Sequence, residues 1–145
     1  MTQQGHLLYL DTSAMIRLYS AEPGRSDVLT EQSAAGGVVA HSITYVEMRA
    51  GLAGRLKRKL MKKGEYNRAV LAFEADWPTF AHVGVNDALM GSAGNLAATH
   101  GLKAYDAVHL AAALTLSPLG LRFMTFDQQL QKVADGVLPG QVWHG

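Results

Sequence analysis

The stretch LLYLD at residues 7–11 is a short, almost wholly apolar run that ends in an acid. Apolar runs of this length are typical of strands buried on both faces of a parallel sheet, and the acid then stands at the carboxyl end of the strand. Thr12 and Ser13 follow directly and can cap a helix that runs through about Ser20, where the EPG turn at 22–24 closes it. The opening segment therefore predicts a strand followed by a helix.

The same alternation continues along the chain. Further strands are expected at 38–41 (VVAH), 81–85 (AHVGV) and 122–127 (RFMTFD), and the weakest pattern suggests a last one around 137–143. Helices are expected at 26–35, 42–63, 65–73, 87–100, within 101–114 and at 128–134, with Gly64 separating two of them. Alternating strands and helices imply a mostly parallel sheet covered on both faces, a three-layer α/β/α sandwich. Ligands of such folds bind beyond the carboxyl ends of the strands.

Composition narrows the class of protein. The 145 residues, 48% hydrophobic and 17% charged, predict a single globular domain over 1–145. The net charge of +1 is too small for the whole surface to bind a polyanion, although basic residues concentrate between Arg55 and Arg68. The absence of cysteine excludes disulfides, thiolate metal sites and cysteine nucleophiles. The N-terminal segment does not resemble a signal peptide and no window is apolar enough to span a membrane, so we expect a cytoplasmic protein without membrane association.

Four acids are expected to converge at the carboxyl edge of the sheet. Asp11 ends the first strand and Asp127 the fourth, so their carboxylates emerge together if these strands are neighbours, about 4.8 Å apart. Asp106 begins a buried helix on the same rim. Glu47 lies in the helix expected at 42–63, and its neighbours three, four and seven positions away are one apolar and three small residues, which leave room for a ligand.

Two of these acids also have ordinary structural explanations. Asp106 could satisfy the free N–H groups at a helix start and complement the helix dipole. Glu47 could be a surface acid of its helix, paired with Arg49 or Arg55.

A cluster of four carboxylates requires protons or a cation, because one pair at 4 Å repels by about 4 kcal/mol at an effective dielectric of 20. Oxygen ligands alone suit Mg²⁺ or Mn²⁺, which keep waters for exchange with a substrate phosphate. None of the six histidines has the spacing of a tight metal motif, so zinc is not expected. The period of two along a strand places Thr125 on the face of Asp127, where it can accompany the acid, although ordinary strand propensity also explains a threonine there. The pattern indicates metal-dependent phosphoryl chemistry.

Four segments, LLYLDTSAMIRLY, TYVEMRAGL, GLKAYDAVHLAAAL and FMTFDQQL, resemble in order and spacing the motifs of PIN-domain ribonucleases, particularly VapC-type toxins of bacterial toxin–antitoxin pairs. The resemblance spans Leu7 to about Ala134. It implies a parallel sheet of about five strands and Mg²⁺- or Mn²⁺-dependent endonucleolytic cleavage of RNA. It also implies a homodimer and a cognate antitoxin whose C-terminal segment occupies the groove. Carried over residue by residue, the acidic site falls on Asp11, Glu47, Asp106 and Asp127, with Thr12, Ser13 and Thr125 as polar support.

The resemblance and the acid pattern together suggest a mechanism. Asp11, Asp106 and Asp127 would hold a metal directly or through water, and Glu47 would bind it or position the attacking water. The ion would lower the pKa of that water for in-line attack, leaving 5′-phosphate and 3′-hydroxyl ends. The basic run RLKRKLMKK at 55–63 could track an RNA backbone, or it could be a solvated helix face. The candidate RNA-binding residues are Arg55, Lys57, Arg58 and Lys59.

Aromatic and histidine residues near these motifs have two interpretations. Tyr45, Trp77 and Tyr105 could stack on bases, or they could pack in the core or in a dimer. His109, one turn after Asp106, is expected to be a packed residue.

Other functions place different demands on the same fold. A receiver-like signalling module needs adjacent acids after its first strand and a lysine ending its last, and neither is present. A haloacid-dehalogenase-like phosphatase needs an aspartate at the position of Ser13. A noncatalytic member of the fold would usually have lost acids. A PIN-fold RNA-processing nuclease without an antitoxin remains an alternative to a toxin.

Overall fold

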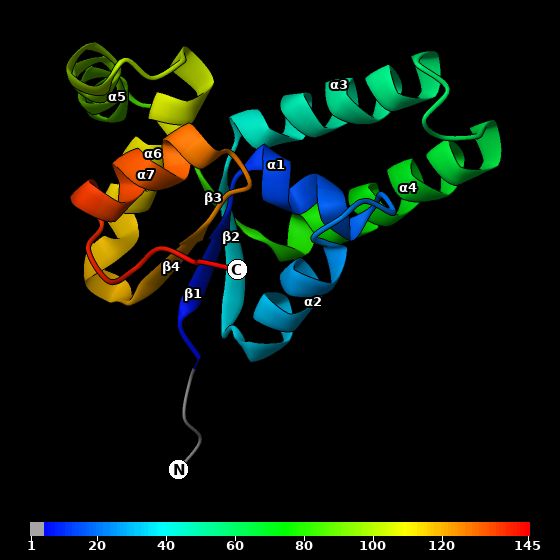
Figure 1. Cartoon of the computed structure of the whole chain (residues 1–145), viewed down its shortest axis with the longest axis horizontal. Coiled ribbons are helices and arrows are strands. Elements are labelled where there is room, and N and C mark those ends of the chain that lie inside the picture. The colour runs from blue at the N-terminus through cyan, green and yellow to red at the C-terminus, as the bar shows by residue number, and fades with distance from the viewer. Residues whose placement is uncertain (1–4) are drawn as a thin grey trace.

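The computed structural model describes residues 5–145; residues 1–4, part of the segment in which no signal peptide is expected, lie outside the described residues. Four parallel strands form one sheet in the order β3-β2-β1-β4 (Figure 1). The strands are β1 (Leu7–Leu10), β2 (Gly37–His41), β3 (Ala81–Val83) and β4 (Leu121–Met124). The first and last strands in the sequence are therefore neighbours, and Leu10 pairs with Met124.

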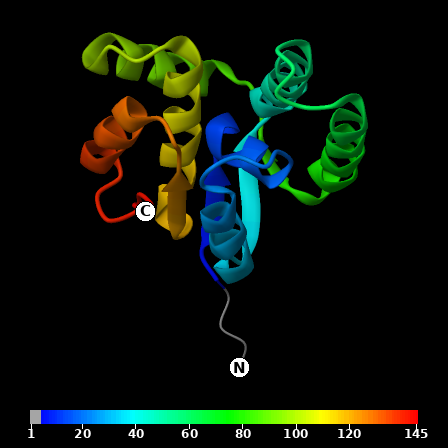
Figure 2. The ribbon, with the colours of Figure 1, turned by 45° about the vertical axis from the view of Figure 1, so that its right-hand side comes forward.

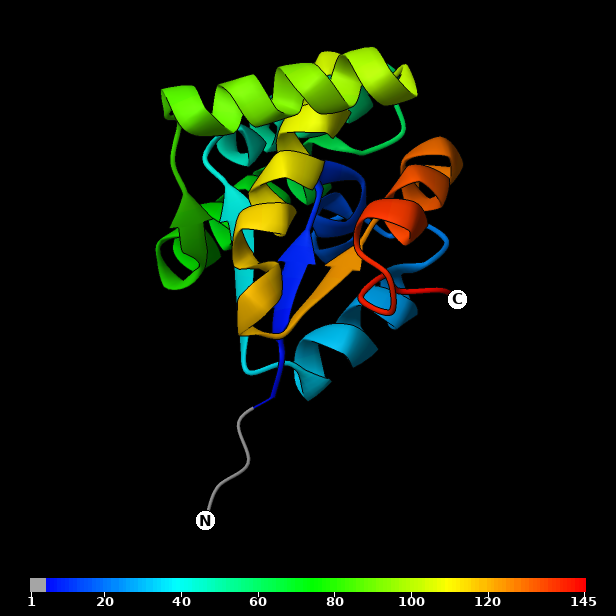
Figure 3. The same ribbon diagram turned by 90° about the vertical axis from the view of Figure 1, so that its left-hand side faces the viewer.

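Helices cover both faces of this sheet, which confirms the α/β/α sandwich (Figure 2). One face carries α1 (Thr12–Met15), the 3-10 helix η1 (Ile16–Leu18), α2 (Arg25–Ala34), α3 (Ile43–Lys57), α4 (Lys63–Asp76) and η2 (Trp77–Thr79). The other carries α5 (Asp87–His100), α6 (Ala104–Leu116), η3 (Ser117–Leu119) and α7 (Gln128–Val137). Figure 3 shows α6 running alongside β1 and in front of β2. No helix within residues 5–145 combines the length and hydropathy needed to cross a bilayer.

Alternate residues of β1 and β2 enter two separate cores, which is why these strands are apolar on both sides. Leu8 and Leu10 of β1 pack with the buried residues of α1, α3 and α4. Tyr9, between them, packs on the opposite face with α6 and α7. The Tyr9 ring stacks on Phe123 of β4 with ring centroids 5.5 Å apart. Both cores therefore depend on the contact between the first and last strands.

The C-terminal tail contributes less to the sheet than the sequence suggested. Instead of a fifth strand around 137–143, α7 continues to Val137 and only an isolated bridge joins Val142 to Phe123. The backbone N–H of Phe123 donates to the Gln141 carbonyl (2.7 Å), and the Phe123 carbonyl accepts from the Trp143 N–H (2.9 Å). The tail thus covers the outer edge of β4 without extending the sheet.

The long helix expected at 42–63 ends at Lys57. Lys59 has a φ of 61°, a left-handed conformation that turns the chain, and α4 begins at Lys63. Gly64 lies inside α4 rather than between two helices. The two helices form a hairpin whose tip carries much of the basic run.

Replacing Phe123 with alanine tests the importance of the contact between β1 and β4. Phe123 is fully buried, and its loss should lower the free energy of unfolding by about 3–5 kcal/mol, as for other buried aromatic residues. Urea denaturation measures this change. The matched control is Leu119→Ala, since Leu119 is 69% exposed and its truncation should change the stability by less than about 0.5 kcal/mol. Equal effects of the two substitutions would contradict the packing described.

Candidate active site

Asp11 lies at the carboxyl end of β1 and is the N-cap residue of α1. Its Oδ1 accepts hydrogen bonds from the Ala14 backbone N–H (3.0 Å) and from the Ser13 hydroxyl (2.7 Å). Its Oδ2 accepts from the Thr125 hydroxyl (2.5 Å). The sequence predicted that Thr12 or Ser13 would cap this helix. The structure shows that Asp11 is the capping residue instead, because its carboxylate accepts the Ala14 N–H.

Burial sets the electrostatics of Asp11. The residue is 3% exposed, and burial raises the pKa of its carboxyl, although nearby His109 and the three hydrogen bonds act in the opposite direction. Hydrogen-bond donors therefore stabilise the ionised carboxylate of Asp11, but they only partly offset the cost of burying its charge.

The segment after β4 carries a second acid to the same edge. The Thr125 hydroxyl, which donates to Asp11, also accepts from the backbone N–H of Asp127 (3.0 Å). Asp127 is exposed and caps α7 through Oδ1, which accepts from the Leu130 N–H (2.8 Å). The strand expected to reach residue 127 ends at Met124, so Thr125 lies in a loop and contacts the acids from there.

Phe126 fixes the path of this loop. Its backbone N–H donates to the Ser13 hydroxyl oxygen (2.9 Å). Its ring lies 4.1 Å from the guanidinium carbon of Arg17 and packs against Trp143, with ring centroids 5.1 Å apart. These contacts turn the chain away from the sheet after Met124 and keep Thr125 in hydrogen-bond contact with Asp11.

Glu47 reaches the site from the second turn of α3. Its Oε1 accepts from the Thr12 hydroxyl (2.7 Å) and lies 2.8 Å from Nε2 of His109. Burial would raise the pKa of Glu47, but the hydrogen bond and electrostatic attraction of His109, together with the Thr12 hydroxyl, outweigh it and lower the pKa. The ionised carboxylate is the stable form at neutral pH.

The structure does not pair Glu47 with a surface arginine. Arg49 contacts Glu74 (3.1 Å) and Arg55 contacts Glu22 (2.6 Å). The interpretation of Glu47 as a solvated acid balanced by these arginines is therefore wrong, because both arginines have acidic partners on other segments.

His109 has a larger part in the site than the sequence suggested. The residue is 2% exposed, as expected for a packed side chain. Its ring, however, lies between two polar groups, with Nδ1 2.7 Å from the Tyr9 hydroxyl and Nε2 next to Glu47. A signal was present in the sequence: a lone polar residue in an apolar helix, three positions after Asp106, needs hydrogen-bond partners.

Asp106 lies in the first turn of α6, whose N-cap residue is Lys103. No side chain within the described part of the protein caps this helix start, so capping does not explain the acid, although its place in the first turn does complement the helix dipole. Burial raises the pKa of Asp106, and further increases come from Asp127, Asp11 and Glu47. Asp106 is therefore within electrostatic reach of all three other acids.

The donor set suits a hard divalent cation, because all four acids offer oxygen and their charge is only partly compensated. As the side chains stand, no three His, Asp or Glu residues between Gly5 and Gly145 form a ready coordination site. Both oxygens of Asp11 are hydrogen-bonded. Asp127 Oδ2 and Glu47 Oε2 have no hydrogen-bond partner among residues 5–145, so they are available to a ligand.

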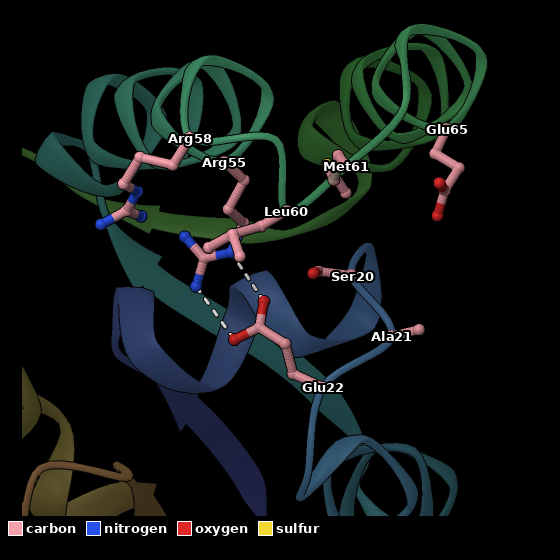
Figure 4. Close-up of a pocket in the computed structure, with 8 residues that line it drawn as sticks. All are labelled: Ser20, Ala21, Glu22, Arg55, Arg58, Leu60, Met61 and Glu65. Atoms are coloured by element: carbon pink, nitrogen blue, oxygen red, sulfur yellow. Dashed lines mark hydrogen bonds and ion pairs between the residues drawn. The ribbon is translucent and has the colours of Figure 1, made fainter.

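The basic segment lies at the far end of α3 from the acids. Figure 4 shows Arg55 pointing at Glu22, to which it donates two hydrogen bonds of 2.6 and 3.0 Å. This pairing lowers the pKa of Glu22 to about 2. Arg55 thus links the loop before α2 to α3 and is not free to bind phosphate. Residues 57–59 are exposed, and the helical rise places residue 58 roughly 16 Å from Glu47.

Comparison with known proteins places this arrangement in a family. The PIN domain family matches residues 8–136. Ribonuclease VapC45 and Ribonuclease VapC49 of Mycobacterium tuberculosis (strains CDC 1551 / Oshkosh and ATCC 25618 / H37Rv) are each 31% identical to this chain over 124 residues, covering 86% of both chains.

Solved structures agree at the level of the fold. FitAcB from Neisseria gonorrhoeae gives a TM-score of 0.67 at 23% identity, and a toxin–antitoxin complex from Klebsiella pneumoniae gives 0.60 at 21% identity. Each comparison covers 94% of this chain and 96% of the other. With the family matched over nearly its whole length, this chain belongs to the PIN domain family and is of the VapC type.

Proposed function

We propose that this protein is a metal-dependent endoribonuclease and the toxin of a type II toxin–antitoxin pair. Its family and its similarity to proteins named Ribonuclease VapC support the activity on RNA. The single observation that carries the proposal is the meeting of acids from separate segments at one edge of the sheet. The Thr125 hydroxyl donates to Asp11 Oδ2 and accepts from the Asp127 N–H, and the Thr12 hydroxyl donates to Glu47. Such a concentration of negative charge at the carboxyl edge of a sheet favours a divalent cation and, through it, a phosphate.

Asp11, Asp106 and Asp127 would hold Mg²⁺ or Mn²⁺. The bound ion would neutralise charge on the scissile phosphate and supply a water of lowered pKa. Glu47 suits the role of orienting that water, since Thr12 and His109 hold Oε1 and leave Oε2 free. With water as the nucleophile instead of the RNA 2′-hydroxyl, the products carry 5′-phosphate and 3′-hydroxyl ends.

The supporting hydroxyls keep the acids in position. Ser13 and Thr125 donate to opposite oxygens of Asp11, which fixes the plane of the carboxylate. The two hydroxyl oxygens are 3.4 Å apart, so the α1 start and the loop after β4 are joined at this point. Preorganised groups of this kind avoid reorganisation during the reaction.

We further propose a cognate antitoxin that occupies the groove beside the acids, and a homodimeric toxin. The structural relative from Klebsiella pneumoniae is a toxin–antitoxin complex, which supports a partner for this chain. The alternative is an RNA-processing nuclease without an antitoxin. A small reading frame just upstream whose product copurifies with this protein would distinguish the toxin from the processing enzyme.

Replacing Asp11 with asparagine tests the acidic site directly. The substitution keeps the volume of the side chain and a capping oxygen but removes the charge. Cleavage of a mixed RNA pool in Mg²⁺ should fall by at least about 100-fold, with the fold retained by circular dichroism. End mapping of the wild-type products should give 5′-phosphates, and EDTA should stop the reaction. Asp27→Asn, in the first turn of α2, is the matched control. Undiminished cleavage by Asp11→Asn would remove Asp11 from the mechanism.

Replacing Asp106 with asparagine tests the excess charge without measuring cleavage. Since the pKa of Asp106 is raised by folding, the free energy of unfolding decreases as the pH rises above the ordinary value of 3.8. Asp106→Asn should therefore raise the Tm of the metal-free protein at pH 7, and this gain should shrink as the pH falls below 3.8. Mg²⁺ should raise the Tm of the wild type more than that of the variant. A lower Tm for the variant at pH 7, or an equal response to Mg²⁺, would argue against the charge cluster.

Exposed lysines at the α3–α4 tip are candidates for binding the RNA backbone. The double variant Lys57→Gln, Lys59→Gln should lower the slope of log affinity against log salt by about 0.7 for every phosphate of a single strand that the protein no longer neutralises. Fluorescence anisotropy with labelled single-stranded RNA measures the slope. Arg122→Gln, which removes an exposed arginine of β4, is the control. An unchanged slope in the double variant would mean that these lysines do not contact RNA phosphates and that the tip is only a solvated surface.

A further inference from the structure

A hollow of ≈ 350 Å³ adjoins the acids. It is lined by Thr12, Ile43, Val46, Glu47, Ala50 and Tyr105. The four α3 residues recur at spacings of three and four, so they form one stripe of that helix. Tyr105 comes from the first turn of α6, one residue before Asp106. The hollow and the acidic site share Glu47 and the hydroxyl of Thr12 that holds it.

Two walls of the hollow are large apolar side chains left in contact with solvent. Val46 is 66% exposed and Tyr105 is 58% exposed. The other aromatic residues that could stack on bases are packed instead: Tyr45 lies against Phe73 at 5.7 Å and against Trp77 at 5.7 Å, measured between ring centroids. Among these candidates, Tyr105 is the one that lines a space beside the acids.

We propose that this hollow receives the nucleobase adjacent to the scissile phosphate of a single-stranded RNA, with the ring of Tyr105 as its stacking surface. The inference rests on the proposed ribonuclease function. Because Glu47 borders both the hollow and the acidic site, one molecule can fill the two when its two groups are separated by only a few covalent bonds. A nucleotide has this construction, with a phosphate at one end and a flat, largely apolar base at the other. Stacking on aromatic side chains is the usual way in which proteins hold unpaired bases.

The charge and size of the hollow favour a base over the other groups that RNA or a protein could offer. No lysine or arginine lines it, and its one charged residue is the anionic Glu47, so a second phosphate has no counter-charge there. Its volume lies near the lower end of small-ligand sites, which begin at about 300 Å³. A stable protein interface instead buries roughly 800 Å² on each partner, so a protein partner would have to extend well beyond the six residues that line the hollow.

A double-mutant cycle between Tyr105 and the base provides the test. The cleaved position is mapped on one single-stranded oligonucleotide, and abasic versions are then made at each nucleotide flanking that position. With wild-type protein in Mg²⁺, one abasic substrate should raise KM about tenfold with a smaller change in kcat, the loss expected for one stacked base. Tyr105→Ala should raise KM for the intact RNA to a similar extent and show no further increase with the abasic RNA.

Two variants control this cycle. Tyr105→Phe keeps the ring and should behave like the wild type. Leu119→Ala removes another largely exposed apolar side chain elsewhere and should also leave KM unchanged. Wild-type KM for Tyr105→Ala, or penalties from the side chain and the base that simply add, would overturn the inference.

Binding measurements separate this inference from the proposed function. The Asp11→Asn variant is titrated in Mg²⁺ with the same oligonucleotide carrying an abasic site at each position in turn. If the wild type cleaves no RNA but Asp11→Asn binds it with one Tyr105-dependent base, the base pocket stands and the nuclease proposal fails. If the wild type cleaves RNA and Tyr105→Ala changes neither KM nor RNA affinity, the nuclease proposal stands and the base pocket fails. No RNA binding by either protein, or a change in oligomeric mass on Tyr105→Ala without a change in RNA affinity, would also reject the pocket.

Discussion

The parallel pairing of β1 with β4 is the constraint on which the rest of the structure depends. The register that sets Leu10 beside Met124 places the next residues, Asp11 and Thr125, in hydrogen-bond contact although they are 114 positions apart in sequence. A shift of one residue would turn every side chain of the strand to the opposite face. The same register stacks Tyr9 on Phe123, so the apolar core and the acidic edge are fixed by one pairing.

The acidic edge is electrostatically uneven, and this unevenness supports the different roles that we propose for its members. Glu47 is partly buried yet has a lowered pKa, because His109 and Thr12 stabilise its charged form. Asp106 has a raised pKa, since burial and three other acids oppose its ionisation. Carboxylates whose environments push their pKa values apart are typical of sites with separate chemical tasks. The pattern fits Glu47 as a permanent acceptor and the aspartates as the group that a cation would neutralise.

The helix α3 carries two surfaces to which we assign roles, one at each end, and packs on the protein between them. Its first turns carry the stripe that contains Glu47 and borders the hollow beside Tyr105. Its middle packs closely on the protein: a Cβ added to Gly51 would lie 2.8 Å from Ile16, so this glycine permits close approach rather than ligand access. Its end carries the exposed basic residues. An RNA strand lying along this helix would thus meet acids, an apolar hollow and positive charge in sequence.

Much of this protein was determined by its sequence alone. The apolar run ending in Asp11 and the regular alternation of segments fixed the α/β/α architecture, because strand and helix periodicities are local properties of the chain. Asp11, Asp106 and Asp127 could be singled out for the same reason, since each ends an expected strand or begins an expected helix, whereas Glu47 stood out through the small residues around it. Tertiary structure decided the remainder. It paired Glu47 with His109, 62 positions away, committed Arg55 to Glu22, and ended β4 at Met124 so that Phe126 could pack on Arg17. These outcomes depend on which side chains meet across space, and local periodicity does not encode a partner on another segment.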